Sequence, residues 1–218
     1  MKLFFPIVLL FIFKSYSQSL ENFIAPKNAE KLVQVEGDLD KDGVDEIVYA
    51  YQSNIPDIDS SFVREIYICK NVNGQIKLWK KNNSILWKTG DFGNDREHNA
   101  DLKILNYTLI LEQTFYSNAR SSSRYKSIFR YQNNDWYLIG SNCFSAVNCL
   151  FEAEDDINFS TKKVIIKQTA TLCDDSISKD KDQNFSFRYP FKRLPKMDNF
   201  IPGKIFLKIP GKDQTFNY

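Results

Sequence analysis

The stretch FRYQNNDWYLIG, residues 129–140, determines the fold class of this chain. Aromatic and polar side chains alternate as far as Gln132, and an aromatic and aliphatic run follows Asp135. Alternation with a period of two is typical of half-buried β-strands. Because asparagine tolerates positive backbone φ, Asn133 and Asn134 favour a tight turn. The stretch therefore predicts a β-hairpin.

The same pattern recurs earlier in the chain. A β-type run at 62–70 leads through Asn73-Gly74 into 76–79, and a second run at 102–105 leads through Asn106-Tyr107 into 108–115. Asn-Gly between apolar runs is the strongest short-range sign of a hairpin. Further short runs of this kind lie at 164–168, 185–189 and 204–209. Successive hairpins of this kind predict an antiparallel meander.

Helical periodicity is weak along the whole chain. Only 26–31 and 142–152 allow a turn or two of helix. We therefore expect an all-β (mainly β) protein with little helix. Its hairpins should form a curved sheet or sandwich with propeller-like pieces.

The N-terminus has the features of a secretory signal peptide. Lys2 precedes a short apolar run, and the small residues Ser15 and Ser17 suit cleavage before Gln18. The run is shorter than the roughly 20 residues that span a bilayer, and no later segment suits a transmembrane anchor. The alternative is an uncleaved, buried N-terminus. We expect a signal peptide at 1–17, a single mostly β domain at 18–218, and a secreted or periplasmic location.

Charge and the single histidine exclude some functions. Without Lys2 and Lys14 the 29 basic residues become 27, equal to the 27 acidic ones. A neutral mature chain argues against a nucleic-acid partner, because such proteins carry a basic excess. His98 alone cannot form a multi-histidine zinc site. It could act as a base beside a serine of 121–123, but a loop histidine is favoured and no Gly-x-Ser-x-Gly motif is present.

Four cysteines are present, at Cys69, Cys143, Cys149 and Cys173. In an exported protein this even number suggests disulfides, and four cysteines allow three pairings. Cys143 and Cys149 flank a short loop and are the first pair to expect. Buried free thiols are the alternative, above all for Cys69. No Cys-x-x-Cys is present, which argues against a redox centre.

The loop DLDKDGVDE, residues 38–46, has the alternate acidic spacing of a calcium site. Hard cations take six to eight oxygen ligands, and a short loop supplies them when alternate residues point inward. Gly43 accepts the tight bend. The expected ligands are the carboxylates of Asp38, Asp40, Asp42 and Glu46 and the carbonyl of Val44. An acidic, solvated turn is the alternative.

An EF-hand would continue into a helix and place Glu at the twelfth position, where this chain has Tyr49 in a β-type run. The loop is instead expected to lie between two strands. In this arrangement residues 37–48 resemble the calcium loops of FG-GAP and VCBS-type repeats, which are found in integrin-like β-propellers and exported bacterial proteins. The resemblance implies Ca²⁺ bound by the residues named above. Because the motif occurs once, we favour one β domain over a complete propeller.

Two functional hypotheses follow. The favoured one is an exported, non-enzymatic β-rich protein with one structural calcium loop, with a protein or glycan surface as partner by analogy with integrin-like repeats. The alternative is a secreted hydrolase that acts on glycans through carboxylates of the acidic loops. We expect Trp79, Trp87 and Trp136 to pack in the core rather than bind sugar. The acids of the alternative are Asp155, Asp156, Asp174, Asp175, Asp180 and Asp182.

Overall fold

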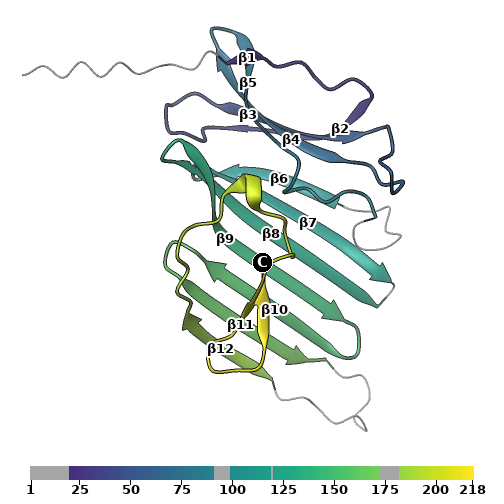
Figure 1. Cartoon of the computed structure of the whole chain (residues 1–218), viewed down its shortest axis with the longest axis vertical. Coiled ribbons are helices and arrows are strands. Elements are labelled where there is room, and N and C mark those ends of the chain that lie inside the picture. The colour runs from purple at the N-terminus through teal and green to yellow at the C-terminus, as the bar shows by residue number, and fades with distance from the viewer. Residues whose placement is uncertain (1–19, 91–98, 119, 172–181) are drawn as a thin grey trace, which may run out of the picture.

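A computed structural model of the chain describes residues 20–90, 99–118, 120–171 and 182–218. Within these ranges the protein is all-β, built from two antiparallel sheets and a two-stranded ribbon (Figure 1). The prediction of an antiparallel meander is confirmed. The described strands form no propeller.

Strands between residues 21 and 82 form a five-stranded sheet with the order β1-β5-β4-β3-β2. Its strands are β1 (Glu21–Asn22), β2 (Ala29–Gly37), β3 (Glu46–Ser53), β4 (Arg64–Val72) and β5 (Gln75–Asn82). The candidate calcium loop is the connection between β2 and β3.

Strands between residues 99 and 188 form a seven-stranded sheet with the order β12-β11-β10-β9-β8-β7-β6. Its strands are β6 (Asn99–Leu105), β7 (Thr108–Asn118), β8 (Ser121–Gln132), β9 (Asp135–Val147), β10 (Phe151–Asn158), β11 (Lys163–Ala170) and β12 (Gln183–Arg188). Every neighbouring pair is antiparallel and consecutive in sequence.

The predicted turn residues occupy the turns. Asn73 and Gly74 join β4 to β5 with φ of 54° and 80°, and Asn133 and Asn134 join β8 to β9 with φ of 50° and 60°. Both residues of each turn have positive φ, as a type I′ hairpin requires. The chemistry of these two residues therefore fixes where each hairpin reverses.

The helical alternative for 142–152 is wrong. This segment is the end of β9, a turn and the start of β10. From Asn142 to Val147, β9 pairs with β8 on one side and β10 on the other, and this pairing overrides the weak local pattern. Residues 26–31 form a turn and the start of β2. The one helical element described is a 3₁₀ turn, η1 (Met197–Asn199).

Within the described ranges, no helix has the length and hydropathy that a membrane span requires.

One hydrophobic cluster contains residues from both sheets and from the C-terminal segment. Trp136 is almost fully buried in it, and Trp79 packs against it. Trp87 is also almost fully buried, against the rings of Phe115 and Tyr125, so the expected core role of the tryptophans is confirmed. The edge strands β2 and β6 lie in contact. There Gly37 approaches Ile104 so closely that a Cβ atom would lie 2.7 Å from Ile104 Cγ2.

The C-terminal segment crosses one face of the seven-stranded sheet and ends in the ribbon of β13 (Phe206–Lys208) and β14 (Thr215–Asn217) (Figure 1). Trp87 Nε1 donates to the carbonyl of Pro202 at 2.9 Å, and the backbone N–H of Asn217 donates to Asp155 Oδ2 at 3.2 Å. The opposite face of the sheet carries the polar side chains considered further below.

Two of the cysteines are buried free thiols, Cys69 and Cys143. The expected pairing of Cys143 with Cys149 is therefore wrong. Cys143 lies inside β9 with its side chain directed into the covered face, whereas Cys149 lies in the following turn. Cys149 is itself disulfide-bonded, and Cys173 lies outside the described residues. Burial raises the pKa of the Cys69 thiol to about 12.

Candidate metal site

The loop between β2 and β3 is anchored at both ends. Leu39 points into the core with 1% of its surface exposed, and its neighbours Asp38 and Asp40 lie at the surface, partly exposed. Lys41 and Gly43 both adopt positive φ, of 71° and 84°, which folds the chain back within a few residues. This local conformation turns the alternate acidic side chains towards one another.

Asp38, Asp40 and Asp42 form a carboxylate triad. One ligand oxygen from each lies within 4.8 Å of the others. Oxygens held at 2.3–2.6 Å from one ion lie within about 5 Å of each other, so this spacing fits a hard divalent cation. The loop backbone orients these groups. Lys41 N donates to Asp38 Oδ1 at 2.6 Å, and Val44 N donates to Asp42 Oδ1 at 2.8 Å.

Glu46 is placed differently from the three aspartates. Its side chain is 1% exposed, and Oε2 accepts the backbone N–H of Leu39 at 2.7 Å. Burial raises the pKa of this carboxyl, which the hydrogen bond from Leu39 and the nearby Lys70 oppose. Glu46 is not a member of the triad. Its position therefore closes the base of the loop.

Lys70, near the end of β4, supplies a positive charge to the acidic loop. Its Nζ forms an ion pair with Asp40 and lies 3.4 Å from both Asp42 Oδ2 and Glu46 Oε1. Burial lowers the pKa of Lys70, but the hydrogen bond with Asp40 and the three negative charges outweigh it, so the pKa is raised. The ammonium thus links Glu46 to the triad.

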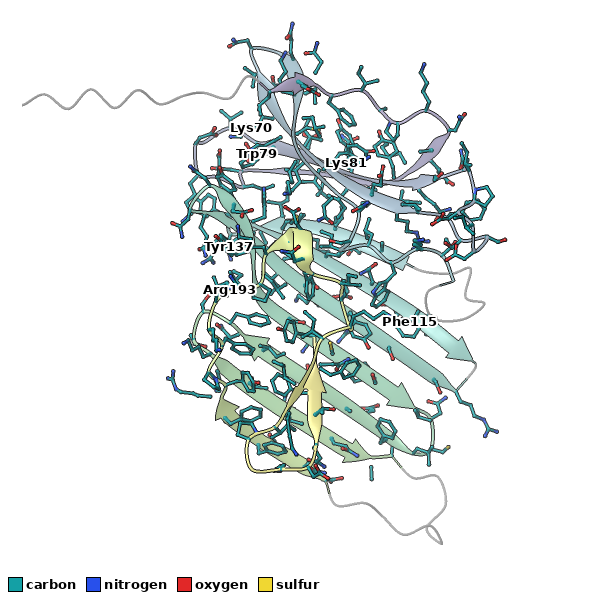
Figure 2. All side chains as sticks on the ribbon, viewed as in Figure 1. Lys70, Trp79, Lys81, Phe115, Tyr137 and Arg193 are labelled. Atoms are coloured by element: carbon teal, nitrogen blue, oxygen red, sulfur yellow. The ribbon has the colours of Figure 1, made fainter. Side chains whose placement is uncertain are left out.

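The site lies where the two sheets meet. Lys70 Nζ is 4.3 Å from the centroid of the Trp79 ring, a cation–π distance, and Figure 2 shows the two side chains next to each other. Trp79 belongs to β5. Its ring makes edge contacts with the rings of Tyr131 and Trp136 from the other sheet, with ring centroids 4.5 and 5.3 Å apart. A change in the position of Lys70 at the loop would therefore affect Trp79 and its contacts with the other sheet.

Among the predicted ligands, the aspartates are brought together, Glu46 lies at the base of the loop, and Val44 lies at its rim. The Val44 side chain is 48% exposed, while its backbone takes part in the loop through Asp42. The arrangement offers carboxylate oxygens from one short loop. It can chelate a hard cation, and it contains no histidine or thiol that would favour a softer metal.

The other sequence candidates are scattered. His98, Asp174, Asp175 and Asp180 lie outside the described residues, and Asp182 accepts a hydrogen bond from the Ala170 backbone at 3.0 Å. Asp155 and Asp156 point to opposite faces of the seven-stranded sheet, since successive strand residues alternate. These two neighbours therefore cannot serve as the carboxylate pair of a hydrolase.

Sequence reasoning did not identify Lys70 or Trp79 as parts of this site. Lys70 lies thirty residues after Asp40. Only the pairing of β3 with β4, in which Ile47 faces Cys69, brings Lys70 opposite Glu46. No local pattern around Lys70 carries this information.

Comparisons of the chain with protein-family models, with curated proteins and with solved structures find no match.

Proposed function

We propose that this chain is an exported, non-enzymatic β protein whose loop 38–46 binds one Ca²⁺ ion as a structural element. The observation that carries the proposal is the carboxylate triad of Asp38, Asp40 and Asp42, whose ligand oxygens lie within 4.8 Å of one another. The Val44 carbonyl and the Glu46 carboxylate, directly or through water, are the further ligands that the sequence spacing favours.

A structural role suits the position of the loop. It connects two neighbouring strands and contacts Lys70, which packs on Trp79 at the junction of the sheets. An ion held there would stiffen both the strand connection and the junction. Extracellular modules use calcium sites with Kd of order 10⁻⁴ to 10⁻³ M, because calcium is abundant outside the cell.

The support for export comes from the sequence. The apolar N-terminal run with its small residues before Gln18 is typical of a signal peptide. The likeness of residues 37–48 to FG-GAP and VCBS-type loops agrees with a secreted or periplasmic location, and with a protein or glycan surface as partner.

Calorimetry and thermal unfolding of the mature chain, with calcium and with EDTA, test the proposal. At about tenfold excess over Kd, calcium should add about 1.4 kcal/mol of stability, which raises the Tm by about 4 °C for a domain of this size. Asp42→Asn should weaken binding by about tenfold, because it removes one ligand charge.

Asp45→Asn is the matched control. Asp45 belongs to the same loop and carries the same charge, but it is exposed and lies outside the triad. Its replacement should leave calcium binding nearly unchanged. An identical Tm in calcium and EDTA, with no heat of binding at millimolar calcium, would contradict the proposal.

A further inference from the structure

The uncovered face of the seven-stranded sheet contains a polar groove that is separate from the acidic loop. The groove has a volume of about 460 Å³ and crosses β7, β8, β9 and β10. This volume lies within the usual range for small-molecule sites. The C-terminal segment covers the opposite face of the sheet (Figure 1). The groove is therefore open to a ligand.

A β-bulge lies in the lining of the groove. Ile128 of β8 faces Gly140 of β9, but the next residue, Phe129, faces Leu138, so Ile139 is an extra residue. At Gly140 a Cβ atom would lie 3.2 Å from Ile128 Cδ1, so the Ile128 side chain packs closely over the glycine and both residues line the groove. Bulges bend a sheet locally and are enriched next to functional sites.

Four polar side chains form a row across the floor of the groove. Glu112, Lys126, Asn142 and Asp156 are direct cross-strand neighbours on β7, β8, β9 and β10. Within the described part of the chain, no hydrogen bond or ion pair engages the side chain of Glu112, Lys126 or Asp156. The row thus presents two carboxylates and the partly buried Lys126 side chain, none of them held by a hydrogen bond or an ion pair, although the charge of Glu112 also acts on the nearby Lys103.

The next row forms a fixed wall. Glu154 accepts hydrogen bonds from Asn142 Nδ2 at 2.8 Å and Lys167 Nζ at 3.1 Å, and these contacts hold its pKa below the usual value. Arg124, on the same side, lies over the Phe144 ring at 5.4 Å. Glu154 and Arg124 are therefore held in place by contacts within the protein. The floor of the groove, by contrast, offers hydrogen-bond donors and acceptors to a ligand.

We propose that this groove binds a neutral, hydroxyl-rich oligosaccharide. An anionic ligand would meet the carboxylates of Glu112, Glu154 and Asp156, and a cationic ligand would meet Arg124 and Lys126. A sugar hydroxyl donates one hydrogen bond and accepts others, so adjacent hydroxyls can satisfy an ammonium and a carboxylate together. Charge complementarity therefore selects a ligand without net charge.

Titration of the mature protein with neutral and charged oligosaccharides tests this proposal. The neutral probes are the hexaoses of xylan, cellulose, starch and mannan, and the charged probes are oligogalacturonate and chitosan oligomers. Binding is followed by amide chemical shifts in NMR spectra and by calorimetry, in EDTA, so that the result does not depend on the calcium loop. At least one neutral hexaose should bind and shift amides of β8 and β9, and the charged probes should bind more weakly.

The variants Lys126→Met and Asp156→Asn should each weaken this binding at least tenfold, since each removes a charge-assisted hydrogen bond. Glu152→Gln, on the same face of β10 but outside the groove, should not change it. Melting temperatures confirm that each variant is folded. The proposal is overturned if no neutral hexaose binds at low millimolar concentration, if a charged probe binds more tightly, or if both variants bind as well as the parent chain.

Discussion

Lys70 is the residue that distinguishes this loop from a bare acidic turn. Its ammonium lies among Asp40, Asp42 and Glu46, where a bound cation would also be attracted. In the chain without metal, this contact neutralises part of the loop charge. A calcium ion bound to the triad would weaken the contact of Lys70 with Asp40, so we expect lysine and calcium to compete for the same carboxylate.

Replacement of Lys70 by Met therefore should have two opposite effects. Without calcium the variant should melt several degrees lower, because a partly buried ion pair loses one partner and leaves carboxylates uncompensated. Its calcium affinity should rise about tenfold, which corresponds to about 1.4 kcal/mol. Lys77→Met, on β5 and bonded to Asn22 rather than to the loop, is the charge control. An unchanged or weaker calcium affinity in the Lys70 variant would refute this competition.

At the scale of elements, the hairpins could be predicted from sequence and β10 could not. The turn residues, such as Asn133 and Asn134, act within two positions, so the local sequence specifies where β8 ends and β9 begins. The acidic segment of β10 has no such local pattern. It becomes a strand because β9 and β11 pair with it on both sides. The same long-range pairing places Asp156 in the groove and Asp155 beneath the C-terminal ribbon.

The contact between β10 and β14 should make stability depend on pH. Burial raises the pKa of Asp155 to about 6, which the hydrogen bond from Asn217 only partly opposes. The unfolded chain has a pKa of about 3.9, so the folded state binds the proton more tightly. The stabilisation of the folded state by protonated Asp155 is complete below about pH 4, and it is lost as pH rises through about 6. Because the carboxyl is partly exposed, we expect a loss of about 1–2 kcal/mol.

Denaturant unfolding of the parent chain and of Asp155→Asn between about pH 4 and pH 7 measures this effect. Asparagine is neutral throughout and keeps an acceptor for Asn217 N–H. The variant should therefore gain about 1–2 kcal/mol relative to the parent as pH rises. Taking the difference between the two curves cancels the contributions of other titrating groups. Parallel curves would show that Asp155 does not have this role.

At the scale of the whole molecule, the junction of the two sheets is the feature that no local pattern predicts. Trp79 of β5 contacts Tyr131 and Trp136 across the junction, and Gly37 of β2 packs on Ile104 of β6. The sequence predicted a core role for the tryptophans from their positions within or beside the hairpin strands. It contained no information on which strands they would join, because these contacts link residues more than fifty positions apart.

Because one hydrophobic cluster contains residues of both sheets, we expect them to unfold together. Trp79→Ala should remove about 2–4 kcal/mol, since it opens a cavity at the junction. Phe206→Ala, at an aromatic side chain that is 63% exposed on β13, should change stability by less than about 0.5 kcal/mol. Near-ultraviolet circular dichroism and hydrogen exchange of amides in β3 and β9 should give one common transition midpoint. If the β3 and β9 amides reported separate transitions, the sheets would be independent folding units, and calcium at the β2–β3 loop would stabilise only the first of them.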